Sequence, residues 1–323
     1  MKKVFFWSIL LLFTLATSSC EAQSQSEFIN VLAGREQQGP ILMGGRAIDE
    51  NQAIYSFDKL IFCDLKDFKV VDSYNTVIAL HPYEEGVTVT FKNKLPPGER
   101  TDIEGRVRDA SGNTLSFRCG VWGYNPQVPH LLISEFTTKG SGNNPDRIEL
   151  LALSNGDLAG VTIFDGVNSD WDSEVILPPY KVKKGDYIVV QYNQELSGKH
   201  PIEFYGGEAG LGSNNGVITL YDAPNGEIID AVVYSNRTSD SDTNYGGFGT
   251  SKVFKRVEAL NKSGQWLPLP ITPERAIDST NSTATRSFCR SGETDTNTKG
   301  DWYICATGKA SFGGENSEEA YTP

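Results

Sequence analysis

Short apolar runs separated by turn residues recur along the chain from Pro40 onward. Between residues 40 and 124 these runs include AIYSFDKLIFC, TVIALH, GVTVTF and TLSFRCGVW. Residues 110–113 (Ala-Ser-Gly-Asn) lie between two such runs and have the composition of a hairpin turn. Strands at this spacing are typical of one β-sandwich, which we predict over residues 40–124.

A second strand-rich region follows residues 125–130 (NPQVPH), whose two prolines and few large apolar groups predict a linker. Its stretch DRIELLALSNGDLAG shows the pattern, since IELLAL predicts a buried strand and residues 154–157 a turn into the next strand. We expect Gly156 to supply a positive φ and Glu149 to point to solvent or to a partner. A ligand-binding loop is the alternative interpretation of this stretch.

One segment has helical rather than strand periodicity. In SKVFKRVEALNKSGQW the apolar residues Val253, Phe254, Val257 and Leu260 recur at helical spacing, and Gly264 is a suitable stop, so we predict a short helix. Three basic residues of this segment are interpreted as a solvated face of that helix: Lys252, Lys255 and Arg256.

The start of the chain predicts export. Residues 1–19 contain two lysines, an apolar run too short to span a bilayer stably, and then small residues before Cys20. A cysteine in this position, followed by the polar run EAQSQSE, resembles a bacterial lipoprotein signal, in which Cys20 would be lipidated and become the mature N-terminus. An ordinary cleaved signal with an incidental cysteine is the alternative. Residues 20–39 are polar and suit a flexible tether.

The other four cysteines are an even number, which fits disulfide bonding in an exported protein. They fall into two groups by position. The simplest pairing joins Cys63 with Cys119 and Cys289 with Cys305, and four unpaired buried thiols are the alternative.

The net charge and the absence of catalytic motifs limit the classes of function that the sequence predicts. The formal net charge is −12, and the chain becomes more negative once a cleaved signal removes two lysines, so nucleic-acid binding is not expected. The sequence has no G-x-S-x-G, H-E-x-x-H, C-x-x-C or P-loop motif, and its three histidines are scattered. We therefore predict no enzymatic activity, no catalytic residues and no cofactor.

An acidic stretch, DGVNSDWDSE, supplies hard oxygen atoms that could bind calcium or remain solvated, and solvation is the preferred interpretation. Its acidic residues are Asp165, Asp170, Asp172 and Glu174.

Aromatic residues in loop-like segments are the candidates for contact with a partner. Trp171 lies within the acidic stretch, and Tyr245 and Phe248 lie in NYGGFG. The alternative is that these side chains fold back onto the sandwich.

Two parts of the chain resemble known modules. The stretches IDENQAIYSFDKLI and TVTFKNKLPPGERTDIEGRVRDASGNTL, within residues 46–124, resemble the immunoglobulin-like modules of bacterial surface and periplasmic lipoproteins. The order of LLISEFTTKGSGNNPDRIELLALSNGDLAGVTIFDG, GVITLYDAPNGEIIDAVVYSN, TRSFCR and DWYICATGKASFGGEN resembles the lamin-tail domain, itself an immunoglobulin-like β-sandwich. That resemblance covers residues 131–316, with an insertion at about 237–284, and leaves a tail at 317–323.

Together the two modules resemble spirochaete lipoproteins of the treponemal type. The expected fold is all-β, with two immunoglobulin-like sandwiches and a short helical insertion in the second. The resemblance implies a non-catalytic envelope protein, held by the lipid on Cys20, in the outer membrane rather than the inner, that binds a protein or glycan partner. Alternatives are a structural scaffold on the periplasmic side and an accessory to exported nuclease or phosphatase activity.

Overall fold

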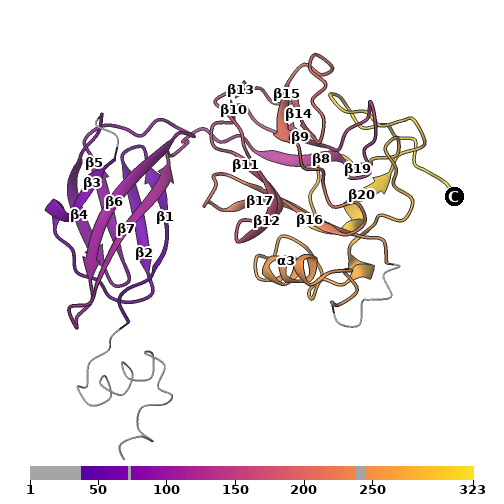
Figure 1. Ribbon diagram of the computed structural model, residues 1–323. Helices are drawn as coiled ribbons and strands as arrows, with labels where there is room; N and C mark the ends of the chain where they lie inside the picture. Colours follow the sequence, from indigo (N-terminus) through magenta and orange to yellow (C-terminus); the bar gives the residue numbers. More distant parts are fainter. Residues whose placement is uncertain (1–37, 72–73, 238–244) are drawn as a thin grey trace, which may run out of the picture.

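Two separate hydrophobic cores organise the chain, one within residues 53–121 and the other within residues 131–302. The computed structural model describes residues 38–71, 74–237 and 245–323, and Figure 1 shows the two β-rich parts. Each core lies between two sheets, so the predicted all-β fold with two sandwiches is confirmed.

The first sandwich packs a four-stranded sheet against a three-stranded sheet. The first sheet has the order β1 (Leu42–Asp49), β2 (Gln52–Phe57), β5 (Gly86–Phe91), β4 (Val77–Tyr83). The second has the order β3 (Phe68–Val70), β6 (Arg100–Arg108), β7 (Thr114–Trp122), and the short helix η1 (Leu65–Asp67) precedes β3.

The β6–β7 hairpin confirms the turn predicted at residues 110–113, where Gly112 has a φ of 87°. Along β6 the residues alternate between buried and outward-facing, as the period of two in a strand requires. Phe117 of β7 covers Gly105 on the neighbouring strand and contacts the rings of Tyr55, Phe57 and Phe68. These aromatic rings fill the first core.

The second sandwich packs a six-stranded sheet against a five-stranded sheet. The six-stranded sheet has the order β15 (Glu203–Gly207), β14 (Tyr187–Tyr192), β9 (Arg147–Ala152), β8 (Leu131–Thr137), β19 (Phe288–Arg290), β20 (Trp302–Ile304). The five-stranded sheet has the order β12 (Asp170–Ile176), β11 (Thr162–Val167), β16 (Gly216–Tyr221), β17 (Ile228–Ser235), β18 (Ile277–Asp278). Shorter elements are the pair β10 (Gly156–Asp157) and β13 (Lys181–Val182) and the helices η3 (Pro273–Arg275) and η4 (Lys299–Asp301).

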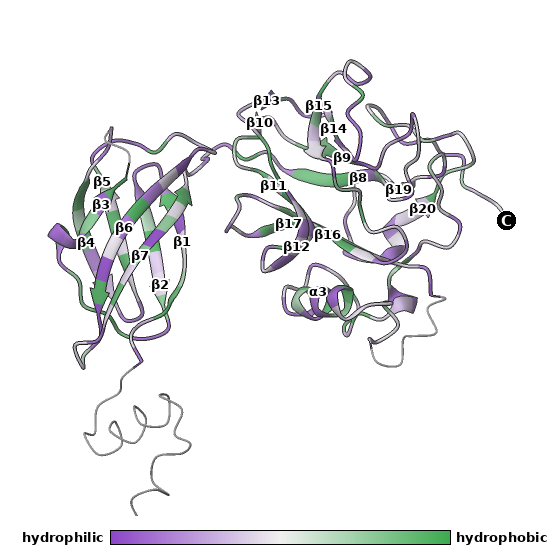
Figure 2. Cartoon of the chain, in the orientation of Figure 1, coloured by the Kyte–Doolittle hydropathy of each residue, from purple (hydrophilic) through white to green (hydrophobic). Residues whose placement is uncertain are grey.

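The central strands β8 and β9 are buried on both faces. All seven residues of β8 are buried, and Figure 2 shows its hydrophobic colouring. One face contributes residues such as Ile133 and Leu150 to the core between the sheets. The opposite face, which carries Glu135 and Glu149, is covered by residues 305–320, which we call the C-terminal strap.

The predicted helix is confirmed as α3 (Ser251–Asn261). The side chain of Thr250 accepts a hydrogen bond from the amide of Val253 and caps the helix. Val253, Val257 and Leu260 are buried, and α3 packs against β11 and β16. The predicted apolar face therefore attaches the helix to the second sandwich.

Two local expectations need correction. Gly156 has no positive φ; a side chain there would meet the backbone oxygen of Gln127 at 2.5 Å, so the glycine permits a close approach of two segments. The segment 317–323 is more than a tail, because Ala320 bridges to Cys305 and the amide of Tyr321 donates to the carbonyl of Ile304. The end of the chain thus extends the edge of the six-stranded sheet.

Candidate functional site

Trp171 is an exposed aromatic side chain at the edge of the five-stranded sheet. It lies on β12, a strand rather than the predicted loop, because Asp170–Ile176 pairs with β11 in an antiparallel hairpin. The side chain is 44% exposed, and its ring lies 6.0 Å from the buried ring of Phe164. Trp171 is therefore held by a core contact while presenting much of its surface to solvent.

The acidic residues beside Trp171 are joined to α3 by ion pairs. Arg256 donates to Asp170 at 3.0 and 3.1 Å and to Asp172 at 3.0 Å, and Lys252 lies 2.8 Å from Asp172. The prediction of Arg256 as part of a solvated helix face is wrong, since its side chain is 3% exposed. Two carboxylates satisfy its fork of donors there.

The four candidate ion-binding carboxylates do not converge on one point. Burial raises the pKa of Asp165 to about 6, whereas Glu174 is exposed on β12. Burial also raises the pKa of Asp172, but the hydrogen bonds from Arg256 and Lys252 outweigh it and hold the pKa below the usual value. Asp170 and Asp172 are thus bound to protein cations, which occupy oxygens that calcium would need.

The other two candidate aromatic residues face inward. Phe248 is 1% exposed and belongs to the second core, so its prediction as a surface contact is wrong. Tyr245 is half-buried at the start of the same turn. Gly247 between them has a φ of 87°, and a side chain there would clash with the ring of Pro273. The glycine-rich segment therefore turns sharply and inserts Phe248 into the core.

The structure separates the first predicted cysteine pair. Cys63 follows Phe62, which bridges to Arg108, whereas Cys119 pairs with Ile103 on β6. Five positions along a strand span roughly 16 Å, far beyond the reach of a disulfide. Both thiols are free, so the predicted Cys63–Cys119 bond is wrong.

The second predicted pair lies together. Cys289 on β19 and Cys305, just after β20, are free and buried, and their sulfur atoms and a Glu135 oxygen lie within 4.8 Å of one another. The Ser287 hydroxyl is 3.1 Å from the sulfur of Cys305 and 3.7 Å from that of Cys289. Proximity is shown for this pair, and its disulfide stays a prediction. The other candidate cysteine, Cys20, lies outside the described residues.

Glu135 and Glu149 are buried opposite each other on β8 and β9, under the C-terminal strap. Glu135 accepts hydrogen bonds from the hydroxyl of Ser287 and from the amide and hydroxyl of Ser311, the latter two at 3.0 Å. Glu149 accepts one from the amide of Gly313 at 2.5 Å. The expectation that Glu149 points to solvent or a partner is therefore wrong.

Burial raises the pKa values of both carboxyl groups, that of Glu149 to about 8. The nearest basic group on this face is Arg147, which stacks over the ring of Phe312 of the strap at 4.2 Å. Burial lowers the pKa of Arg147, and its Nε has no hydrogen-bond partner within the described chain. The sheet face beneath the strap thus holds more acidic than basic groups.

The role of Glu135 was not predicted from the sequence. Its one local signal is a charged residue inside the apolar run LLISEFT. The groups that bind it come from residues 287 and 311, more than 150 positions later, so no local pattern could identify them.

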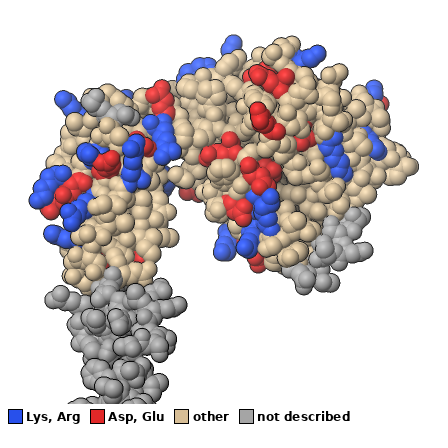
Figure 3. Space-filling view, in the orientation of Figure 1, with Lys and Arg blue, Asp and Glu red and all other residues tan. Residues whose placement is uncertain are grey.

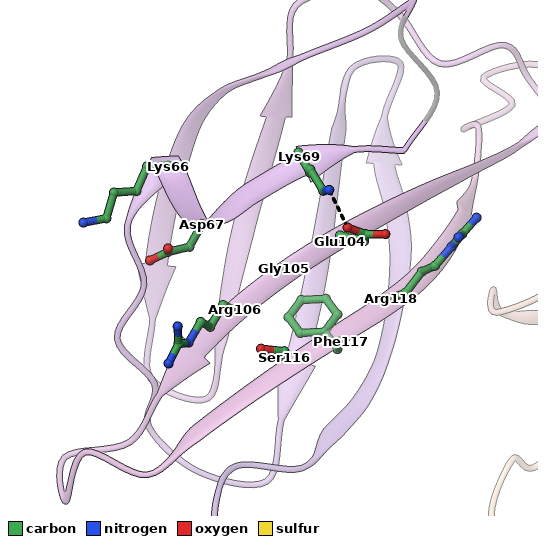
Figure 4. A pocket seen from close by; sticks show the side chains of 9 residues that line it. All are labelled: Lys66, Asp67, Lys69, Glu104, Gly105, Arg106, Ser116, Phe117 and Arg118. Carbon is green, nitrogen blue, oxygen red and sulfur yellow. Dashed lines mark ion pairs between the residues drawn. The ribbon is translucent and has the colours of Figure 1, made fainter.

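A shallow pocket of about 420 Å³ lies on the outer face of the three-stranded sheet (Figure 4). In that view the ring of Phe117 lies between Arg106 and Arg118, Lys66 points away from it, and Lys69 pairs with Glu104 at 2.7 Å. Arg118 also pairs with Asp102 at 2.8 Å. Acidic and basic side chains are mixed over this sandwich (Figure 3), so this pocket presents no uniform charge to a ligand.

Comparison with known proteins identifies a family and an uncharacterized relative. The sequence profile of the family described as "TP_1001_2nd: protein second domain" matches residues 129–201 and 205–304, more than half of the chain. A protein of Treponema pallidum (strain Nichols), described as uncharacterized, is 25% identical over 166 residues, which are 46% of this chain and 42% of that protein. The chain thus spans less than half the length of this relative.

Among solved structures, two crystal structures of the bacterial S-layer protein SbsC are similar at a TM-score of 0.27 each. The N-terminal part of SbsC is 13% identical, with 65% of this chain and 46% of that chain covered. The second structure, of residues 31–844, is 11% identical, with 62% and 41% covered.

Proposed function

Because the chain belongs to the TP_1001 second-domain family, of treponemal type, we propose that it is a non-catalytic, lipid-anchored protein of the cell envelope that binds a protein or glycan partner. The observation that carries binding is Trp171. Trp171 is exposed on an edge strand, its ring contacts the buried ring of Phe164, and ion pairs lie beside it. Exposed tryptophans held in this way are typical of the residues that contribute most to binding at protein interfaces.

The burial of the reactive groups supports a non-catalytic role. The thiol of Cys289 and the carboxyl group of Glu135 lie beneath the C-terminal strap, and the thiol of Cys305 is buried at its start. A substrate cannot reach these groups without displacing that segment. Assays of the purified protein for DNA and phosphoester hydrolysis test this part. Turnover that survives further purification would contradict it.

Binding is tested with an array of purified matrix proteins and glycans. We expect Trp171→Ala to abolish or strongly weaken any saturable interaction of the wild-type chain. Tyr205→Ala is the matched control, because Tyr205 is an exposed aromatic residue, 39% accessible, on the edge strand of the opposite sheet. Equal binding by wild type and Trp171→Ala would exclude this edge as the binding surface.

Lipid anchoring rests on the sequence around Cys20. Among the described residues, no helix has the length and apolar character needed to cross a membrane. We expect the wild-type chain to incorporate labelled palmitate and to partition into detergent, and Cys20→Ser to do neither. Labelling of Cys20→Ser equal to that of wild type would contradict the anchor.

Location separates adhesion from the scaffold alternative. We place the chain in the outer membrane, and protease treatment of intact cells, with a periplasmic protein as integrity control, reports its side. Cleavage supports a partner outside the cell, whereas protection favours a periplasmic scaffold.

We also propose that the second sandwich is of the lamin-tail type, because of the order of its strand segments and its two-sheet architecture.

A further inference from the structure

Two thiols and a carboxylate from adjacent strands meet in a buried site at one end of the six-stranded sheet. Cys289 on β19 pairs directly with Glu135 on β8, and the amide of Cys305 donates to the carbonyl of Ser287. The exposed fraction of Glu135, Cys289 and Cys305 is 0%. Figure 1 shows β19 and β20 beside the yellow C-terminal strap that covers them.

The hydrogen-bond partners of Glu135 are neutral, and Arg147 acts on its charge only through space. Within the described chain its hydrogen bonds come from the neutral hydroxyl and amide groups of Ser287 and Ser311. A buried carboxylate is costly unless a cation or a proton neutralises it. Ser287 donates its one hydroxyl proton to Glu135, so the thiols are left to donate toward the serine oxygen. Within the described chain the site thus brings together two buried thiols and a carboxylate that has only neutral hydrogen-bond partners.

We propose that Glu135, Cys289 and Cys305 bind a single zinc ion, in place of the disulfide predicted for the two cysteines, which are free in this structure. Two thiolates and a carboxylate are a donor set that zinc accepts, with the fourth tetrahedral position left for the hydroxyl of Ser287 or for water. Zinc bond lengths of about 2.3 Å to sulfur and about 2.0–2.2 Å to oxygen place donor atoms about 3.3–3.8 Å apart. The three donor atoms lie within 4.8 Å of one another, so zinc binding requires them to approach by up to about 1 Å.

Binding of Zn²⁺ releases the protons of both thiols, so the net charge of the site with ionised Glu135 stays at minus one and is spread over three ligands and the metal. The metal links β8, β19 and the start of the strap, which gives it a structural role. This inference is independent of the partner proposed above, because it concerns groups buried on the other sheet.

The test uses the full chain, purified in detergent under reducing conditions and then passed through gel filtration. We expect about one zinc per chain by elemental analysis, and cobalt substitution to give the charge-transfer absorption of thiolate ligands. Cys305→Ser and Glu135→Gln should lower zinc retention at least tenfold. Cys63→Ser and Cys119→Ser, which alter thiols of the first sandwich, should retain it fully.

A second measurement does not depend on the variants folding. A chelator should remove the zinc from wild type and lower its melting temperature, and added zinc should restore both. Absence of stoichiometric zinc in the reduced wild-type chain would overturn the proposal. So would a Cys289–Cys305 disulfide in protein isolated from cells with thiols blocked, which intact mass reports as the loss of two hydrogens.

Discussion

At the scale of single residues, Glu149 imposes a pH dependence on the second sandwich. Its pKa lies at about 8, against an ordinary value of 4.5, because burial disfavours the charged form. Between these values the folded chain holds a proton that the unfolded chain has lost, so the free energy of unfolding falls as pH rises from 4.5 to 8. At 1.36 kcal/mol per pKa unit the loss is on the order of 5 kcal/mol.

We expect Glu149→Gln to reduce this slope, most clearly between pH 6 and 8, because glutamine keeps an acceptor for the amide of Gly313 and cannot ionise. The buried Asp165, whose pKa is about 6, contributes to the slope only below that range. Urea unfolding of the full chain at pH 5, 7 and 9 measures the effect. Glu195→Gln, an exposed carboxylate in the same sandwich, should retain the wild-type slope. A wild-type slope in Glu149→Gln would show that another group is responsible.

Arg290 forms an ion pair with the buried carboxylate of Asp230. It donates to Asp230 at 2.6 Å and to Asp295 at 2.9 Å, and it stacks on Trp302 at 4.7 Å. Removing one partner of a buried pair leaves the other uncompensated, so Arg290→Met should cost about 3–5 kcal/mol.

Adding Asp230→Asn to Arg290→Met should recover part of that loss, because the fully buried carboxylate nearest to Arg290 is then removed together with its cation. Arg118→Met, at an exposed ion pair in the first sandwich, should cost less than about 1 kcal/mol. Denaturant unfolding of wild type, Asp230→Asn, Arg290→Met and the double variant gives the coupling energy of the pair. If the double variant is less stable than Arg290→Met, the lost stability comes from packing rather than from charge.

At the scale of elements, α3 depends on its cap. Thr250→Ala removes the acceptor for the amide of Val253 and should lower stability by about 1 kcal/mol. Ser251→Ala, one position later and exposed, should change the melting temperature far less. Equal shifts for the two variants would mean that the cap contributes little.

Elements also show how far the sequence could predict this structure. Alternating apolar positions and the turn at residues 110–113 predicted the strands and the β6–β7 hairpin, because both signals are local. The spacing of Val253, Val257 and Leu260 predicted α3 for the same reason. The Cys63–Cys119 pairing failed because an even cysteine count carries no information about register.

The clusters beneath the strap and around Arg256 were not predictable, since their members meet only after distant strands pair. Asp172 and Arg256 are separated by 84 residues along the chain and Glu135 and Ser311 by 176. A charged residue in an apolar run signals burial with a partner, but the partner follows from the tertiary fold alone.

At the scale of the whole molecule, the two sandwiches touch through backbone at Gly98 and Gly160. A side chain on Gly98 would meet the amide nitrogen of Gly160 at 2.6 Å, and Asn125 of the predicted linker donates to the carbonyls of Asp157 and Ala159. The linker segment is therefore attached to the second sandwich, and Gly98 permits the first to approach it.

We expect Gly98→Ala to separate the sandwiches. Gly112→Ala is the matched control, since both glycines have a positive φ, 71° and 87°, but a side chain on Gly112 has open space. Both variants should lose about 1 kcal/mol from backbone strain in the first sandwich. Only Gly98→Ala should also increase the radius of gyration and speed proteolysis at residues 125–130. If both variants scatter X-rays as wild type does, the contact at Gly98 does not fix the arrangement of the two sandwiches in solution.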